Sequence, residues 1–333
     1  MRRPTAATCV LACIAQKSNG LANPKEANLQ GFIDESGGRR SCQIGTSKHG
    51  VRGLLATSDL RPGEAVLQIP LSCVLVEQDD GMESWPGRLA NQLINRSKDC
   101  CYKASLPEPP CTPARGDWPA SILDAFENPS FIDEINEAHE WRMSQYEQHC
   151  GVQAKEQEFL NTLDLVCSRT IRIKNELMLV PLLDMANHAS RNQGGGYFKK
   201  LESSVCLMAG DRGVRNGEEV TLDYGDRRNE EWLIHYGFLP DRNAAETITL
   251  PQSKPVVSWD DVGTLNVELR QQCLEYLNES KSSLEEDLGL LHSPIDDFRM
   301  VTAIKYRVDR KILLSAIAGE KAANRLSAFS SFA

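Results

Sequence analysis

Two adjacent polar residues, Asn187 and His188, end the mostly apolar run 180–186. An amide and an imidazole offer both hydrogen-bond donors and acceptors, so the pair has two interpretations. The side chains either satisfy buried backbone groups, or they bind the adenine or amino acid part of a small ligand. The residues alone leave both interpretations open.

Glycines and tyrosines mark two further stretches. Gly50 and Gly53 lie in the stretch 48–56, where they either form a β-turn or permit a close approach of the backbone to a ligand. Tyr224 precedes Gly225, and Tyr236 precedes another glycine. Two such tyrosines either line a cavity, where a neutral hydroxyl is both donor and acceptor, or belong to an aromatic core.

Two other kinds of site find little support in the sequence. His188 could be a general base in a hydrolase, but no Gly-x-Ser-x-Gly nucleophile motif accompanies it. The eleven cysteines are scattered and none forms Cys-x-x-Cys, so we predict no metal site. Their odd number favours free thiols in a reducing compartment over a disulfide scaffold.

The elements that must position these residues alternate between strands and helices. Residues 29–76 have the pattern of short strands, and 61–64 (Arg-Pro-Gly-Glu) predicts a hairpin turn between two of them. From residue 85 to about 165 the apolar spacing is helical, interrupted by five prolines within 106–119. Strands return over 166–250, and the chain after Pro255 is helical. We therefore predict an α+β protein of about two domains.

The last helix has one apolar face and several basic residues. The apolar residues Val301, Ile304, Val308 and Ile312 recur at steps of three and four. The basic residues on its other faces are Arg299, Lys305, Arg307, Arg310 and Lys311. We predict that the helix packs on an apolar core with these cations in solvent, and a binding surface is the alternative.

Taken in order, the stretches 48–64, 180–188 and 220–238 resemble a SET-domain methyltransferase. They are most similar to the branch that contains Rubisco large-subunit lysine methyltransferase and actin-histidine methyltransferase. Residues 303–314 are similar to part of the C-terminal domain of this branch. The resemblance implies a β-rich SET core with a pseudoknot, split by a helical insertion and followed by a helical substrate-binding domain. The implied segments are the core at 29–84 and 166–250, the insertion at 85–165 and the last domain at 251–333.

The resemblance also implies a cofactor, S-adenosylmethionine (SAM), and the residues that bind it. The glycine-containing stretch supplies backbone contacts, Ser168-Arg169 matches a Ser-Arg pair, and Asn187-His188 matches the Asn-His of the pseudoknot. The implied cofactor-binding residues are Gly50, Arg52, Arg169, Asn187, His188 and Tyr224. The implied catalytic residues at the methyl-transfer site are Tyr224 and Tyr236, the second of which matches a tyrosine of lysine-specific members.

The activity that the resemblance implies is transfer of a methyl group to a lysine amine of a protein. Three positions depart from patterns of the family. Gly50 stands where the family usually carries Glu. Ile171 and Leu183 stand where the histidine-methylating members carry Asn and Trp, which argues against a histidine substrate. A protein-histidine methyltransferase and a SET-like binding module with little turnover remain the alternatives.

Charge and hydropathy limit the class of partner. The chain has 46 acidic and 37 basic residues, a net charge of −9, and no basic excess of the kind that nucleic-acid binders have. The sequence contains no run of about 18 apolar residues, so it predicts no membrane-spanning helix. We expect a protein partner with an accessible lysine. Residues 1–28 form either a targeting segment or a disordered or helical start, which leaves plastid and cytoplasm open.

Overall fold

The structure, a computed structural model, describes residues 23–48, 50–81, 84–97, 100–149, 155–241, 243–251, 255–263 and 266–319. The described residues form two compact units. The strand unit contains 23–110 and 140–225, and the helical unit contains 111–139 and 226–319. The predicted targeting or disordered segment lies almost wholly outside the described residues.

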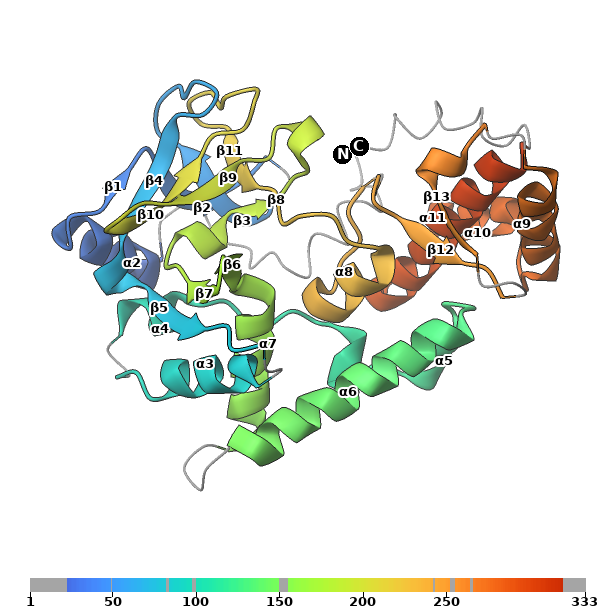
Figure 1. The fold of residues 1–333 in the computed structure, drawn as a ribbon, viewed down its shortest axis with the longest axis horizontal. Helices are drawn as coiled ribbons and strands as arrows, with labels where there is room; N and C mark the ends of the chain where they lie inside the picture. The colour runs from blue at the N-terminus through green and yellow to red at the C-terminus, as the bar shows by residue number, and fades with distance from the viewer. Residues whose placement is uncertain are drawn as a thin grey trace. The chain divides into compact units, whose positions relative to one another are not determined.

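The strand unit is built from three sheets (Figure 1). One sheet has the order β1-β4-β10-β9, a second β2-β3-β11-β8, and a third β5-β7-β6. The strand bounds are β1 Arg39–Arg40, β2 Cys42–Thr46, β3 Arg52–Ala56, β4 Ala65–Pro70, β5 Leu75–Gln78, β6 Ile171–Ile173, β7 Glu176–Leu179, β8 Asn187–His188, β9 Tyr197–Lys200, β10 Ser204–Met208 and β11 Glu219–Leu222.

Strand β11 lies between β3 and β8, and this position brings distant parts of the sequence together. It pairs antiparallel with β3, with Val220 opposite Leu54. It pairs in parallel with β8, with Thr221 opposite Asn187 and Leu222 opposite His188. The parallel pairing places the end of the 180–188 stretch directly beside the start of the stretch that contains Tyr224.

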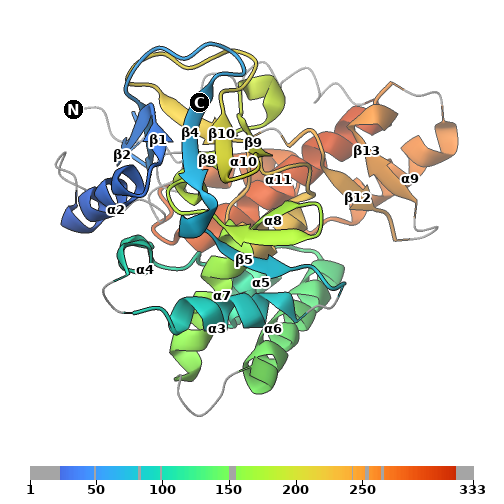
Figure 2. The same ribbon diagram turned by 60° about the vertical axis from the view of Figure 1, so that its left-hand side comes forward.

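Helices cover the sheets of the strand unit (Figure 2). They are α2 Pro24–Glu35, α3 Trp85–Ile94, α4 Cys101–Ser105, α7 Glu156–Arg169 and the second half of α6 Pro129–His149. Helix α2 contacts α4, and α3 contacts α7. The core is apolar and includes the fully buried Leu54, Leu67 and Phe159.

Two expectations for the N-terminal part were wrong. Residues 29–35 belong to α2 and not to a strand, because Asn23 caps the helix and Pro24 begins it, two signals that precede the predicted region. Residues 61–64 do form a turn, with Glu64 N–H donating to Arg61 O at 3.0 Å and Gly63 at φ +70°. The strands on either side are not a hairpin, however, since β3 and β4 belong to different sheets.

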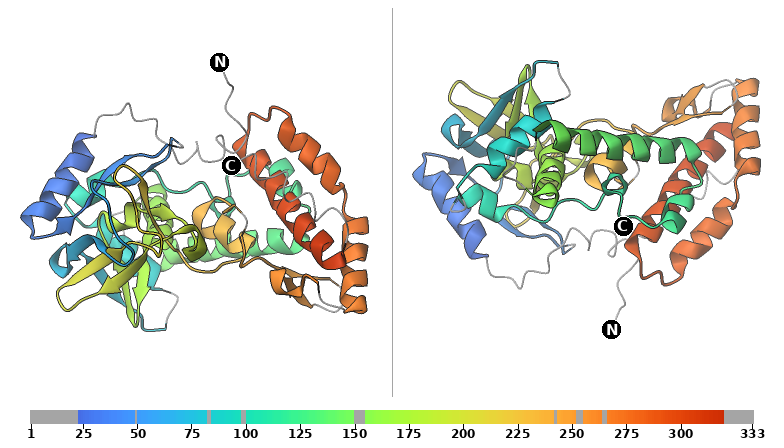
Figure 3. Two further views of the ribbon diagram at one scale, coloured as in Figure 1. Left: turned by 90° about the horizontal axis from the view of Figure 1, so that it is seen from above. Right: turned by 90° about the horizontal axis from the view of Figure 1, so that it is seen from below.

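The helical unit contains the remaining helices and one hairpin. Its elements are α5 Ala120–Asp124, the first half of α6, α8 Asn229–Tyr236, β12 Thr247–Thr249, β13 Val256–Ser258, α9 Val267–Glu279, α10 Leu284–His292 and α11 Phe298–Ala318. Helix α11 packs against α9 and α10 (Figure 3). Its buried Tyr306 joins an aromatic cluster with Phe126 and Phe131, whose rings lie 5.3 Å from it.

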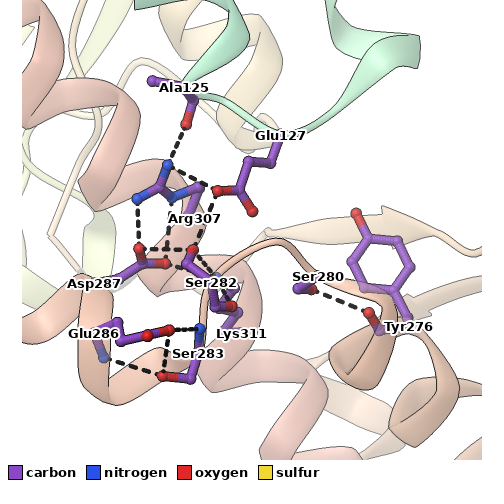
Figure 4. A network of polar contacts seen from close by, with 10 residues as sticks. All are labelled: Ala125, Glu127, Tyr276, Ser280, Ser282, Ser283, Glu286, Asp287, Arg307 and Lys311. Carbon is purple, nitrogen blue, oxygen red and sulfur yellow. Dashed lines mark hydrogen bonds and ion pairs between the residues drawn. The ribbon is translucent and has the colours of Figure 1, made fainter.

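Three of the five basic residues of α11 are not in solvent, contrary to the prediction, while Arg299 and Lys305 are partly exposed. Arg307, Arg310 and Lys311 are buried, at 8%, 6% and 4% exposure. Arg307 and Lys311 both bind the carboxylate of Asp287, which is 0% exposed, in the network of Figure 4. Only the apolar half of the prediction holds, because the acidic partners come from segments far along the chain that the helical pattern does not reveal.

The described residues contain neither a helix suited to span a membrane nor a cluster of metal ligands. None of their helices is both long enough and apolar enough to cross a membrane. No three of their histidine, cysteine or acidic side chains gather in a cluster able to hold a metal ion.

Candidate functional site

The candidate site of the strand unit lies where β8 runs beside β11. The chain reaches β8 through the buried strand β7 and a single helical turn, 183–185. Leu182, between them, is fully buried and has φ +71°, a backbone conformation that costs a non-glycine residue about 1–3 kcal/mol. The surrounding core enforces this strained bend, which directs the next residues onto the edge of β11.

Asn187 ties three strands together through its side-chain amide. Its Nδ2 donates to the backbone oxygen of Arg52 at 2.9 Å and to Glu219 Oε1 at 2.7 Å. Arg52 begins β3, and Glu219 begins β11. The amide of Asn187 therefore satisfies a backbone oxygen and a carboxylate within the protein, which was the first of the two interpretations of this residue. The family resemblance assigns the same residue to cofactor binding.

His188 and Tyr224 lie against each other. Their ring centroids are 5.3 Å apart, and the backbone N–H of Tyr224 donates to His188 Nδ1 at 3.3 Å. Because a backbone N–H only donates, Nδ1 accepts, and a neutral His188 then carries its proton on Nε2. The hydroxyl of Tyr224 donates to the backbone oxygen of Ala186 at 2.7 Å, so the ring has a fixed orientation beside β8.

Arg169, in the last turn of α7, binds the segment that precedes β8. Its Nη1 donates to Asp184 O at 2.7 Å and contacts Asp184 Oδ2 at 3.3 Å. The hydroxyl of Tyr102 donates to the same carboxylate oxygen at 2.8 Å. The Asp184 side chain is 1% exposed, and burial raises its pKa, while Arg169 acts in the opposite direction. Burial also raises the pKa of Tyr102 well above its usual range.

Tyr102 and Asp184 are site residues that the sequence analysis missed as such. Asp184 stands three residues before Asn187, within the same motif, and this spacing was a signal that could have found it. Tyr102 had no signal, because it comes from a short helix 82 residues earlier in the chain. Both hold Arg169 and the turn before β8 in their positions.

Gly50 and Arg52 lie at the start of β3. Gly50 has φ +78° and donates its N–H to Ser47 O at 2.9 Å, and a Cβ added there would meet nothing within 4 Å. The guanidinium of Arg52 binds Glu26 at 2.5 Å and Ser105 O at 3.2 Å. The side chain of Arg52 is thus bound within the strand unit, and its backbone oxygen accepts from Asn187 Nδ2.

Tyr236 lies in the helical unit, whereas the other six predicted site residues all lie in the strand unit. It ends α8, and Gly237 at φ +74° caps the helix by donating to Leu233 O and Trp232 O. The ring centroid of Tyr236 lies 5.0 Å from that of Trp232, and the guanidinium carbon of Arg227 lies 5.5 Å from it. The position of Tyr236 is therefore set by α8 and its aromatic neighbours.

Solved structures with the same architecture identify the fold. The chain is similar to the SET domain of LSMT bound to lysine and AdoHcy, with a TM-score of 0.66 and 17% identity over 91% of this chain and 92% of that one. It is also similar to Rubisco LSMT bound to AdoMet, with a TM-score of 0.68 and 15% identity over 92% and 93%. The chain thus has a SET-domain fold. Within that class it has the architecture of Rubisco LSMT, and the predicted α+β core with C-terminal helices is confirmed.

Sequence relatives match a short part of the chain. No protein-family profile matches the chain. Actin-histidine N-methyltransferase of Canis lupus familiaris is 38% identical over 74 residues, and that of Homo sapiens is 36% identical over the same length. These matches cover 22% of this chain and only 12% of the relatives' length.

Proposed function

We propose that this chain is a SAM-dependent protein methyltransferase whose target is the side-chain amine of a lysine. One observation carries the proposal. In a SET-domain fold, the parallel pairing of β8 and β11 sets Asn187 and His188 beside Tyr224, whose hydroxyl is fixed on the backbone of Ala186. The solved neighbours of this fold include structures bound to AdoMet, AdoHcy and lysine.

The residues of the strand unit suit the proposed cofactor. Arg169 Nε and Asp184 Oδ1 are buried and have no hydrogen-bond partner within the part of the chain that the structure describes. A buried polar atom without a partner is costly, and ligand or water atoms commonly supply one. We assign cofactor binding to Arg169, to the side chains of Asn187 and His188, to Tyr224 and to the backbone of Gly50 and Arg52.

The proposed reaction joins a nitrogen to a methyl carbon and breaks the bond from that carbon to sulfur. Bound SAM would supply the methyl group on a positively charged sulfur. A lysine amine has an ordinary pKa of about 10.4, so losing its proton at pH 7 costs about 4.6 kcal/mol. A narrow, desolvating site lowers this cost because burial disfavours the ammonium form. The protein must also hold the nitrogen, the methyl carbon and the sulfur nearly on one line.

Tyr224 has the role of orienting group in this proposal. Its hydroxyl is held by Ala186 O at 2.7 Å, which fixes the oxygen without ionising it. A neutral phenol oxygen accepts a hydrogen bond from the amine and weak C–H···O contacts from a polarised methyl group. Tyr236 is assigned to the same step, because an aromatic ring attracts a cation such as the sulfonium of SAM.

Lysine is favoured over histidine by three positions. Tyr236 matches a tyrosine of lysine-specific members, while Ile171 and Leu183 replace the Asn and Trp of the histidine-methylating members. Histidine is the second candidate, because the sequence relatives are actin-histidine N-methyltransferases. We propose a protein partner with an accessible lysine, and neither a nucleic acid nor a membrane.

The test is transfer of a labelled methyl group from SAM into a whole-cell protein extract, with modified residues mapped by mass spectrometry. Label on lysine supports the proposal and identifies the substrate. Label on histidine would overturn the preference for lysine. Binding of SAM by the purified chain without any labelled residue, in extracts from several sources, favours a binding module.

We expect Asn187→Ala to weaken both folding and cofactor binding. The substitution removes the donor from Arg52 O and from Glu219, and such lost bonds cost about 1–3 kcal/mol. Urea unfolding followed by circular dichroism should show this loss, and calorimetry should show a SAM Kd raised by about tenfold or more. Asn95→Ala, at an exposed position after α3, is the control, and it should change the free energy of unfolding by less than about 0.5 kcal/mol. An unchanged Kd would contradict the assignment of Asn187.

A further inference from the structure

Two buried carboxyl groups meet the N-terminal turn of α8 in the helical unit. Glu230 and Glu246 are 3% and 2% exposed. Glu246, just before β12, accepts the backbone N–H of Asn229 at 2.6 Å through Oε2. Glu230 accepts the hydroxyl of Tyr306 at 2.6 Å and Arg310 Nη1 at 2.9 Å, both through Oε1. The two carboxyl groups thus connect α8 to α11 and to the start of β12.

Each of these carboxyl groups has a second oxygen that is buried and unpartnered. Across the described ranges, neither Glu246 Oε1 nor Glu230 Oε2 has a hydrogen-bond partner. Two carboxylates buried together resist ionising at once, because each negative charge raises the free energy of the other. A single proton removes one charge and also turns one of these acceptor oxygens into a donor.

Two cations, Arg228 and Arg310, act on Glu230, and the guanidinium of Arg228 is already paired with Glu134 at 2.6 Å. Arg310 is the cation that binds Glu230, and Asp309, also on α11, adds a negative charge that acts on Glu246. Lys305 on the same helix is paired with Asp241 at 2.5 Å. Burial, followed by the charge of Glu230, raises the pKa of Glu246 to about 8, against the opposing effects of the Asn229 N–H and Arg310.

We propose that Glu246, buried beside Glu230, keeps its proton at neutral pH, and that the two glutamates position α8 and therefore Tyr236 at its other end. The two glutamates are positioning residues. The proton on Glu246 depends on the helical unit alone, while its link to Tyr236 rests on the proposed function. Loss of the proton above about pH 8 buries a second negative charge beside Arg310 and weakens the attachment of α8.

The variant that tests the proton is Glu246→Gln. Its amide keeps an oxygen to accept from Asn229 N–H and places N–H donors where the proton would be. In the wild type, the folded state keeps a proton that the unfolded chain releases above the ordinary glutamate pKa of about 4.3. Stability therefore falls as the pH rises from there to about 8, with a tenfold increase of the unfolding constant per pH unit from this group.

The first measurement is urea unfolding of the full chain between pH 5.5 and 9, followed by hydrogen exchange of α8 and α11. We expect the Gln variant to lack the tenfold change per pH unit that Glu246 contributes. Glu279→Gln removes the same charge at an exposed position of α9 and should keep the wild-type slope. Equal slopes in wild type and Glu246→Gln would overturn the proposal.

A second measurement needs no folded variant. Infrared difference spectra of the wild type should contain the carbonyl band of a neutral carboxyl group that disappears with a midpoint near pH 8. Absence of this band at pH 7 would overturn the proposed proton on Glu246. Methyl transfer then tests the link to Tyr236: kcat should fall less above pH 8 in Glu246→Gln than in the wild type, with the SAM Kd unchanged. If the wild type shows the expected infrared band and pH dependence of stability but no methyl transfer, the proposed function is wrong and the proposed protonation of Glu246 is supported.

Discussion

Tyr224→Phe should lower the kcat of methyl transfer by at least about 100-fold while leaving the SAM Kd within about threefold of the wild-type value. The substitution removes one oxygen and keeps the ring that lies 5.3 Å from His188. Loss of one preorganised polar group from a reacting centre typically costs 10²–10³ in kcat, or about 2.7–4 kcal/mol. The lost hydrogen bond to Ala186 O costs only about 1 kcal/mol of stability by comparison.

The measurement is single-turnover transfer of labelled methyl groups into the substrate found in the extract, with SAM binding followed by calorimetry. Tyr197→Phe is a matched control, since Tyr197 is a partly exposed tyrosine of the strand unit, in β9. It should keep kcat within about twofold. If Tyr224→Phe turns over like the wild type with equal SAM affinity, the proposed role of Tyr224 is wrong.

The succession of strands and helices was predictable from the sequence because it depends on local patterns. Helix α6 begins at Pro129, at the Asn-Pro-Ser signal before a helical spacing of apolar residues, and α3 begins at Trp85 where that spacing starts. Pairing between strands was not predictable in the same way. The turn at 61–64 gives no information on whether its flanking strands pair, and β4 instead pairs with β1 and β10.

The candidate site shows the same limit. The resemblance assigned residues within its motifs to one site, and the register of β8 on β11 brings His188 beside Tyr224. Residues outside the motifs had no such signal, and Tyr102 is the example, since its bond to Asp184 spans 82 positions. Burial of a charge is equally non-local. It depends on a counter-charge that only the folded chain supplies, as the cations of α11 show.

Asp287 is the counter-charge for two of these cations. Its carboxylate binds Arg307 and Lys311, with Lys311 Nζ at 2.6 Å, and accepts the hydroxyl of Ser282 at 2.9 Å. Arg307 also pairs with Glu127 at 3.0 Å, and Lys311 donates to Ser282 O at 2.7 Å. Figure 4 shows this arrangement, in which two cations and two carboxylates balance each other inside the helical unit.

We expect Asp287→Ala to lower the free energy of unfolding of the helical unit by about 3–5 kcal/mol. The substitution leaves the buried Arg307 with Glu127 as its carboxylate partner and removes the carboxylate that the buried Lys311 binds, and an uncompensated buried charge has a cost of this size. Hydrogen exchange of peptides from α10 and α11 measures the effect, because it reports the stability of each region separately. Peptides from α3 and α7, in the strand unit, should keep their exchange rates.

Two further variants separate charge from the volume of the lost side chain. Glu285→Ala, at an exposed neighbouring position of α10, should change stability by no more than about 0.5 kcal/mol. The double variant Asp287→Ala with Lys311→Met removes one stranded cation and should recover at least about 1 kcal/mol relative to Asp287→Ala, since contacting residues are not additive. If the double variant is no more stable than the single one, buried charge is not the cause. The cost then comes from the cavity and the lost hydrogen bonds, and the cations of α11 do not depend on Asp287 for their burial.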